Sequence, residues 1–163
     1  MKTIKKLFAL LLVCTTILTL TGCGEKNVEG TLEDIMKKIN THTYEGLADD
    51  EKPMLIDIDV LKDAPDTIEY YIGTDEIEYE EIYASEPAMS SIAYSVVLVR
   101  MKDGADIEAA KTEIKENVNP AKWLCVDVPK DKVIVKSKGD LIILIMVADD
   151  TTREKLEEGF DNL

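Results

Sequence analysis

Two segments in the second half of the chain constrain the fold most, because both are apolar on both faces of an expected strand. Residues 91–101 (SIAYSVVLVRM) and 141–148 (LIILIMVA) are rich in β-branched and aliphatic side chains. Strands of this composition lie at the centre of a sheet that is covered on both faces. The N-terminal half of the chain, or a second copy of it, must therefore supply part of that cover.

The rest of the second half predicts two helices and further strands. Apolar residues recur at helical spacing over 107–118, and this helix should end before Asn119-Pro120. Thr151 and Glu154 form a capping box for a last helix. Between the helices we expect a strand or a bent pair of strands at 123–128 and 132–136, then a tight turn over 137–140. The β-α-β-β-α order over 91–163 predicts an α+β fold, an antiparallel sheet with helices packed on it.

The first half begins with a clear helix signal. Thr31 is a good N-cap, with Asp34 three residues later, and the apolar face that follows fades near Asn40. A second, short helix should end at residues 70–72, because Gly73 suits the left-handed position after a helix. Between them, residues 54–60 (MLIDIDV) form a possible strand.

Residues 74–87 are acidic and fit a solvated edge strand. Ile77, Tyr79 and Tyr83 fall on one parity of this segment, and Glu76, Glu78 and Glu80 fall on the other. Residues 78–82 fit a single helical turn equally well. Six acids and no Lys or Arg lie within 75–86, so the segment should repel itself and remain exposed.

The N-terminus has the form of a secretory signal. Lys2, Lys5 and Lys6 precede 14 apolar residues, Leu7–Leu20, and small residues then lead to Cys23. A helix of that length rises about 21 Å, short of the roughly 30 Å hydrocarbon core, which disfavours an uncleaved anchor. The end of the segment resembles the lipobox of bacterial lipoproteins, in which the cysteine becomes the lipid-modified N-terminus. We therefore predict a signal peptide at 1–22, a lipidated Cys23 with a short flexible tether to residue 30, and one domain at 31–163.

Charge excludes some partners. Loss of three lysines with the signal takes the formal charge from −14 to −17. Nucleic acid is an unsuitable partner, because phosphate binding requires clustered Lys and Arg. Adhesion to anionic lipid is disfavoured for the same reason, so the lipid on Cys23 must hold the chain to the outer face of the cell membrane.

Cysteine usage excludes an internal disulfide. Cys14 leaves with the signal and Cys23 carries lipid, so Cys125 alone remains. Its neighbours Trp123, Leu124 and Val126 are apolar, and free cysteines in such a setting are usually buried. We expect Cys125 and Trp123 to lie in the core, with the thiol unreactive.

The second half also resembles a known family. The relevant stretches are Glu86-Pro87, SIAYS at 91–95, VVLVRMKDGAD at 96–106, ENVNPAKWLCV at 116–126, KVIV at 132–135 and KGDLIILIMV at 138–147. They are similar to a domain of unknown function in small lipoproteins of Gram-positive anaerobes, largely Clostridia. The resemblance implies the compartment and an α+β domain. It brings no activity, cofactor or catalytic residue with it.

Catalytic and metal motifs are absent from the sequence. The single histidine, His42, has no motif linking it to Cys125, and histidine-based zinc sites need more ligands than the chain holds. No nucleophile elbow, zinc-protease helix, Walker loop or dinucleotide fingerprint occurs. We therefore name no catalytic residue, metal ligand or cofactor. Calcium binding by residues 75–81 stays a weaker option, since the EF-hand spacing is missing.

Two functional classes remain. We favour a non-enzymatic binding or protein-interaction module of the cell envelope, whose partner is another envelope protein or a second copy of the chain. Its candidate interaction face comprises Glu76, Glu78, Tyr79, Glu80 and Tyr83. The alternative is a small envelope hydrolase that uses paired carboxylates, such as Asp57 and Asp59, about 7 Å apart on one strand face.

Overall fold

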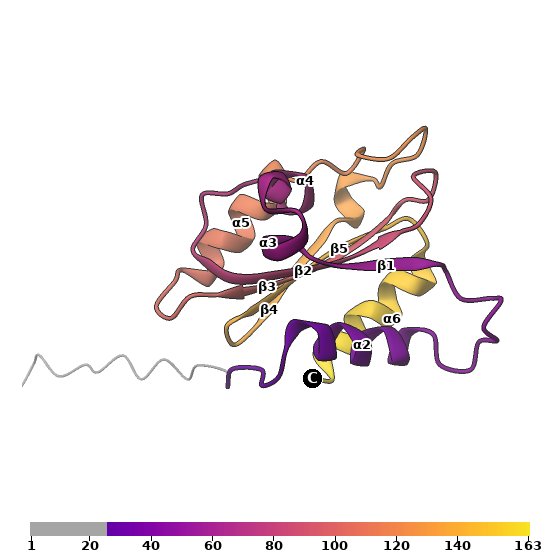
Figure 1. Ribbon diagram of the computed structural model, residues 1–163, viewed down its shortest axis with the longest axis horizontal. Coiled ribbons are helices and arrows are strands. Elements are labelled where there is room, and N and C mark those ends of the chain that lie inside the picture. The colour runs from indigo at the N-terminus through magenta and orange to yellow at the C-terminus, as the bar shows by residue number, and fades with distance from the viewer. Residues whose placement is uncertain (1–25) are drawn as a thin grey trace, which may run out of the picture.

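The fold is built on one five-stranded antiparallel sheet with strand order β1-β2-β3-β5-β4 (Figure 1). The computed structural model describes residues 26–163, so the predicted signal peptide and Cys23 lie outside the described residues. The strands are β1 (Leu55–Asp59), β2 (Tyr79–Pro87), β3 (Tyr94–Met101), β4 (Ile134–Lys138) and β5 (Leu141–Val147). The sheet and its helices confirm the predicted α+β class.

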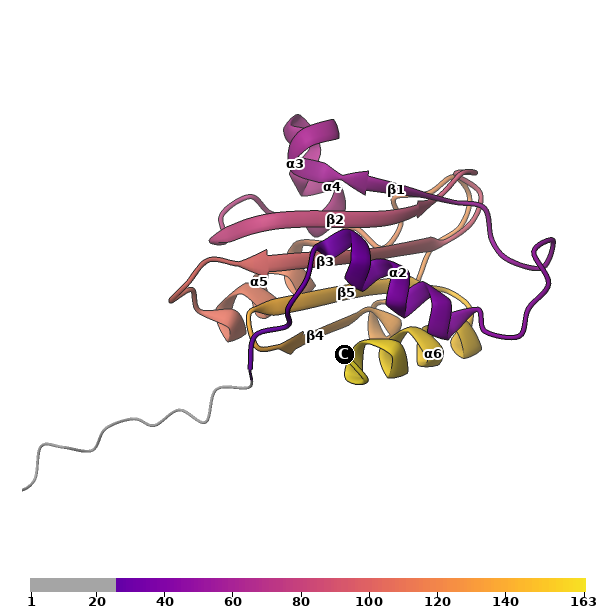
Figure 2. The ribbon, with the colours of Figure 1, turned by 60° about the horizontal axis from the view of Figure 1, so that its bottom comes forward.

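Helices cover both faces of the sheet (Figures 1 and 2). Two long helices, α2 and α6, lie side by side on one face, and α3, α4 and α5 lie on the other. The helices are α2 (Leu32–Thr43), α3 (Val60–Asp63), α4 (Ile68–Ile72), α5 (Ile107–Asn117) and α6 (Asp150–Asp161), with short 3-10 turns at Pro65–Thr67 and Lys130–Lys132. No helix within residues 26–163 combines the length and apolar character needed to cross a membrane.

The central strands contribute side chains to two separate cores. Every residue of β5 is buried, and β3 is buried except for Arg100, which is partly exposed. Val97 and Leu144 point into the core beneath α5, whereas Leu98 and Ile143 point into the core beneath α2 and α6. The cover that the two apolar segments require comes from the same chain: α2, α3 and α4 belong to its first half.

The acidic segment differs from the sequence expectation in two ways. The strand β2 is not at the edge of the sheet, because β1 pairs with its outer side. A register shift between Tyr79 and Glu81 adds a residue to β2, so the parity of its side chains changes there. Tyr79 therefore packs against the core beneath α5, while Tyr83 faces α2. The position of such a bulge depends on how the strand pairs with its neighbour. The alternation of residues along one strand carries no information about that pairing.

The first helix and the short helix before Gly73 form where the sequence predicted them. Thr31 caps α2 by accepting a hydrogen bond from the Asp34 amide at 3.1 Å, although the helix continues to Thr43 rather than fading near Asn40. Gly73 adopts a left-handed conformation with φ of 81°. A Cβ there would lie 2.3 Å from the backbone nitrogen of Val118, so the close approach of the two segments also requires glycine.

Three expectations in the second half were wrong. Residues 123–128 form no strand but an irregular segment over the sheet, in which Trp123 is buried and the backbone reverses at Cys125 with φ of 62°. The last helix is capped by Asp149, whose carboxylate accepts a hydrogen bond from the Thr152 amide at 2.7 Å, and not by Thr151. The strand β4 begins at Ile134, two residues later than expected.

The segment before α2 is attached to the domain, in contrast to the flexible tether we expected. The Arg100 guanidinium donates hydrogen bonds to the carbonyl oxygens of Val28 at 3.0 Å and Gly30 at 2.9 Å. The same guanidinium bonds to the Asp140 carboxylate at 3.0 Å. A Cβ on Gly139 would lie 2.7 Å from the carbonyl oxygen of Lys26, so this chain segment runs directly against the β4–β5 turn.

We predict that Arg100→Met releases residues 26–30 from the domain. The variant loses three charge-assisted hydrogen bonds and leaves the half-buried Asp140 carboxylate without its partner, so the free energy of unfolding should fall by about 2–3 kcal/mol. Hydrogen exchange of a peptide covering residues 26–31 should become faster. The exposed neighbour Lys102 provides the control, because Lys102→Met changes the charge equally and should leave this exchange unchanged. Unchanged exchange in Arg100→Met would contradict the attachment.

Candidate functional site: an acidic groove at the sheet edge

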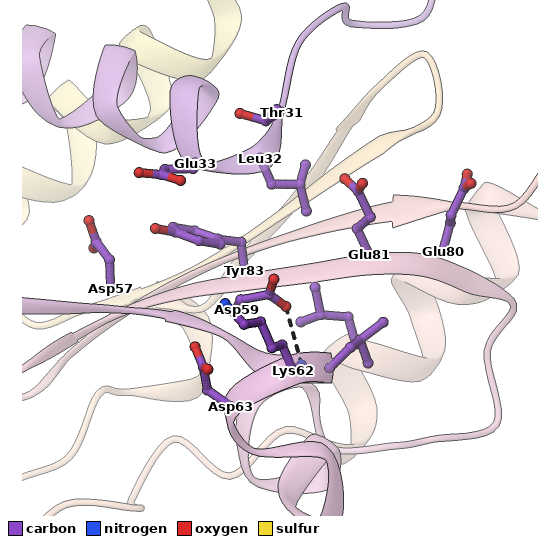
Figure 3. Close-up of a pocket in the computed structure, with 12 residues that line it drawn as sticks. Thr31, Leu32, Glu33, Asp57, Asp59, Lys62, Asp63, Glu80, Glu81 and Tyr83 are labelled. Atoms are coloured by element: carbon purple, nitrogen blue, oxygen red, sulfur yellow. Dashed lines mark hydrogen bonds between the residues drawn. The ribbon is translucent and has the colours of Figure 1, made fainter.

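A groove of about 650 Å³ lies between the start of α2, the edge strand β1 and the bend into α3 (Figure 3). Six carboxylates and one ammonium group line it. The carboxylates belong to Glu33, Asp57, Asp59, Asp63, Glu80 and Glu81, and the ammonium to Lys62. The groove therefore carries a strong excess of negative charge.

Sheet register places the central members of the groove. Asp57 pairs with Ser85 and Asp59 pairs with Tyr83 across the β1–β2 ladder. Residues two apart on a strand share a face, so both aspartates and Tyr83 point toward α2. The first turn of α2 adds Glu33 from above, and Figure 3 shows the Tyr83 ring lying between Glu33 and Asp59.

The Asp59 carboxylate also has a structural role. It caps α3 by accepting a hydrogen bond from the Lys62 amide at 3.3 Å. The cap bends the chain away from the sheet directly after β1, and this bend forms one wall of the groove. Asp57 is exposed and forms no hydrogen bond or ion pair among the described residues, so its carboxylate is available to a partner.

The electrostatics of the groove are visible at Tyr83. Burial raises the pKa of this phenol, and the negative charges of Asp57, Glu33, Asp59 and Asp63 raise it further. All four carboxylates come from segments other than β2, so the fold gathers their charges around one aromatic side chain.

The strand β1 leaves one backbone edge open. Within residues 26–163, no strand pairs with its outer side. Its two faces differ in chemistry: Asp57 and Asp59 line the groove, whereas Ile56 and Ile58 face the opposite side, where Ile56 is 51% exposed. An open strand edge of this kind accepts an added strand from another chain.

The structure divides the predicted interaction face into two parts. Glu80 and Tyr83 lie in the groove. Glu76 and Glu78 line a separate hollow of about 260 Å³ beside α5, and Tyr79 is half-buried against the core near it. Asp57 and Asp59, which sequence reasoning assigned to the hydrolase alternative, join Tyr83 instead. The two-residue spacing of Asp57 and Asp59, which places them on one strand face, was the one sequence signal that they belong to a common site.

A buried polar cluster lies on the other face, at the end of β2. The Lys122 ammonium contacts the Glu86 carboxylate at 2.8 Å and the Ser95 hydroxyl at 3.1 Å, and its side chain is 2% exposed. The Tyr70 ring lies 4.3 Å from the same nitrogen. Sequence reasoning missed this cluster because its members are up to 52 residues apart in the chain.

The cluster has the residue types of a serine nucleophile with a lysine base, but its position indicates a structural role. Ser95 is fully buried, and the ion pair with Glu86 is enclosed by Tyr70 and Trp123. Desolvation lowers the pKa of Lys122, and the carboxylate of Glu86 opposes that shift. A substrate has no access to the hydroxyl. We therefore assign the cluster a structural role, which is to hold residues 118–133 against the sheet.

Cys125 and His42 do not form a catalytic pair. Cys125 is exposed, contrary to expectation, because it lies in an irregular segment outside the sheet, in which Leu124 is exposed as well. Trp123 is buried as predicted. His42 lies on α2, 3.7 Å from the Glu158 carboxylate of α6, on the opposite face of the sheet from the Cys125 segment.

Metal binding has no built site in the part of the chain that the structure describes. No three His, Cys, Asp or Glu side chains there come together in an arrangement that could hold an ion.

Comparisons with known proteins gave no relatives: no family model, curated protein or solved structure matches the chain. We therefore infer function from the geometry and chemistry of the groove.

We predict that Asp57→Asn lowers the pKa of Tyr83 toward the ordinary value of about 10. A raised pKa means that the folded state holds the phenolic proton more tightly than the unfolded state, so stability falls as pH rises above about 10. The substitution should reduce that alkaline loss. Tyrosine-specific NMR over a pH series measures the pKa, and Glu76→Gln, outside the groove, serves as the control. Equal shifts in both variants would contradict a local effect of the groove.

Proposed function

We propose that this protein is a lipid-anchored, extracytoplasmic, non-enzymatic interaction module that binds an extended basic segment of another envelope protein along β1. The observation that carries the proposal is the open edge of β1 beside the acidic groove. Added strands form main-chain hydrogen bonds with an open edge, and their alternating side chains meet the two faces separately.

The chemistry of the two faces specifies the partner. A strand added beside β1 places alternate side chains toward Asp57 and Asp59, where Lys or Arg is the charge complement. The intervening side chains lie beside Ile56 and Ile58, where apolar residues are the better fit. The preferred partner segment therefore alternates basic and apolar residues, and Tyr83 offers an aromatic surface to its cations.

A second copy of this chain is a poorer partner than a basic protein. Pairing two β1 edges brings the aspartates of one copy beside those of the other, and like charges opposite each other destabilise a strand pair. Acidic residues on an edge strand thus oppose self-association while leaving the edge open to a basic chain.

The attachment of residues 26–30 supports a position close to the membrane. Two residues separate Cys23 from Lys26, and the three peptide steps between them span at most about 11 Å. With lipid on Cys23, the β4–β5 turn lies nearest the bilayer and β1 remains accessible from the side. The partner is therefore a protein that is itself near the membrane surface.

The hydrolase alternative has weaker support. Asp57 and Asp59 share one strand face, where alternate residues lie about 7 Å apart, within the range of two-carboxylate catalysis. Both side chains are exposed, however, and Asp59 caps α3. A general acid at neutral pH is usually kept protonated by an apolar pocket. The groove surrounds its carboxylates with other carboxylates and water, which favours binding of cations over catalysis.

A peptide that alternates lysine and valine tests the proposed interaction. We predict saturable binding, with the amides of residues 55–59 showing the largest NMR shifts. The double variant Asp57→Asn/Asp59→Asn should weaken binding about tenfold, since two exposed ion pairs are lost. Asparagine remains a good cap for α3, so the fold should persist.

The double variant Glu76→Gln/Glu78→Gln is the matched control, because it removes the same charge outside the groove. It should bind the peptide nearly as well as the wild type. Equal weakening by the two double variants would show general attraction to an acidic protein and would overturn the groove as the site. A peptide with glutamate in place of lysine should not bind.

A separate experiment tests the proposed lipid anchor. We predict that labelled palmitate marks the wild-type protein in growing cells and spares Cys23→Ala, because the thiol of Cys23 is the proposed site of modification. The variant should also leave the membrane fraction. Cys125→Ala is the control and should be labelled as the wild type is. Equal labelling of all three proteins would contradict the proposed lipid anchor on Cys23.

A further inference from the structure

Exposed apolar side chains gather at the end of the sheet where β1 begins. Of the seven large apolar side chains that are exposed within residues 26–163, five lie there: Met54, Ile56, Tyr70, Met89 and Leu124. Four of the five are more than half exposed, and Met54 is 76% exposed. Single exposed apolar residues are common on proteins, whereas a group of them marks an interaction site. We call these five residues the apolar patch.

Backbone hydrogen bonds bring three members of the patch together. The Met54 carbonyl accepts a hydrogen bond from the Ala88 amide at 2.9 Å, and the Ser90 carbonyl accepts one from the Leu124 amide at 2.8 Å. Met89 therefore lies between the two attachment points. Figures 1 and 2 show the start of β1, the β2–β3 connection and the segment after α5 at this same end of the sheet.

The patch continues along the face of β1 that lies opposite the acidic groove. Ile56 pairs with Glu86, and cross-strand partners share a face. The Glu86 carboxylate contacts the Lys122 ammonium, and the Tyr70 ring lies 4.3 Å from that nitrogen. Met54 comes two residues before Ile56 and therefore lies on the same side of the chain. The open edge thus has an acidic side and an apolar side, and the apolar side extends past the start of the strand.

A strand added along β1 needs more than the groove to bind tightly. The strand has five residues, and Asp57 and Asp59 are exposed, so each ion pair with their carboxylates contributes little free energy. Interfaces draw most of their binding free energy from a few large side chains that become fully desolvated. The apolar patch lies directly beyond Leu55 and offers a surface on which such a side chain can be buried.

We infer that the basic partner segment carries an aromatic anchor residue, which binds the apolar patch directly after the residues that pair with β1. This inference rests on the proposed function and adds the class and position of the residue that determines specificity. Aromatic rings offer a large apolar area, and methionine sulfurs make favourable contacts with them. Met54 and Met89 supply two such sulfurs.

Strand register gives the position of the anchor. Every strand pair in this sheet is antiparallel, and antiparallel pairing is the more stable arrangement per residue. An antiparallel segment runs from Asp59 toward Leu55, so its C-terminal end passes the patch. Counting from a lysine opposite Asp59, every second residue faces the groove, and the sixth residue lies opposite Met54 on the apolar side. The anchor therefore follows the basic residues in the partner's sequence.

Position and charge argue against two other occupants of the patch. Arg100 holds the segment that leads to Cys23 at the far end of β3, and a strand of eight residues spans about 26 Å. The patch therefore lies away from the membrane in the proposed orientation. A second copy of this chain would bring together two proteins that each carry a formal charge of −14, and their repulsion opposes association.

Three capped peptides of equal charge test the anchor: KVKVKV, KVKVKW and WKVKVK. We expect KVKVKW to bind the protein about tenfold more tightly than KVKVKV, because the tryptophan ring is buried on the patch. WKVKVK should gain little, since its ring lies beyond the other end of β1. NMR cross-peaks should join the tryptophan ring to the methyl groups of Met54 and Met89. Met36, Met101 and Met146 are buried, and their methyl groups serve as internal controls.

The double variant Met89→Gln/Leu124→Gln removes patch side chains that lie outside β1, so the strand edge stays intact. Both side chains are more than half exposed, so the fold should persist. The variant should lose the gain from tryptophan and bind KVKVKV as the wild type does. Leu47→Gln changes an exposed apolar residue outside the patch and is the control, which should keep the gain.

Several results would overturn the inference. If KVKVKV binds and tryptophan adds nothing at either end, the anchor is wrong while the proposed function stands. If no peptide binds, the proposed function fails as well. An equal gain from tryptophan at both ends, or an undiminished gain in the double variant, shows non-specific apolar contact. Shifts of the Met54 and Met89 methyl signals with protein concentration alone, or with phosphatidylglycerol vesicles, assign the patch to a second copy or to lipid instead.

Discussion

The structure depends on the burial of β3 and β5 on both faces. Side chains from this strand pair enter two cores, so neither face can remain open to water. The chain meets this requirement with helices from both of its halves: α2 and α6 close one face, while α3, α4 and α5 close the other. Everything at the margins of the sheet, including the groove and the apolar patch, lies where this cover ends.

Two buried or half-buried cations join segments that the hydrophobic cores alone would not align. Lys122 joins residues 118–133 to the ends of β2 and β3 through Glu86 and Ser95. Arg100 joins the segment before α2 to the β4–β5 turn. Each cation has several partners in a poorly solvated position, which makes removal of one member costly and fixes the local geometry.

Three features of the surface occupy different parts of the sheet. The attached N-terminal segment lies at one end, the apolar patch lies at the other, and the open strand edge runs between them at the side. This separation is compatible with the proposed tethered module, whose open strand edge meets its partner away from the membrane attachment.

Sequence reasoning succeeded where a local pattern carries the information. Apolar runs identified β3 and β5, helical spacing identified α5, and Thr31 and Gly73 marked helix ends, because each signal depends on residues a few positions apart. The α+β class followed from these elements. The shared face of Asp57 and Asp59 was also readable, since alternation along a strand fixes it.

Tertiary structure decided what depends on residues far apart in the chain. The bulge in β2 separates Tyr79 from Tyr83, and only the pairing with β3 determines its position. Cys125 has apolar neighbours in the sequence, but it is exposed because the segment around it is irregular. The groove, the Lys122 cluster and the apolar patch each combine segments from several elements. The sequence by itself determined β3, β5, α5 and the ends of two helices, because these signals are local, and it predicts the membrane anchor in the same way. The sites arose from packing, which brings distant charges and hydroxyls within reach of one another.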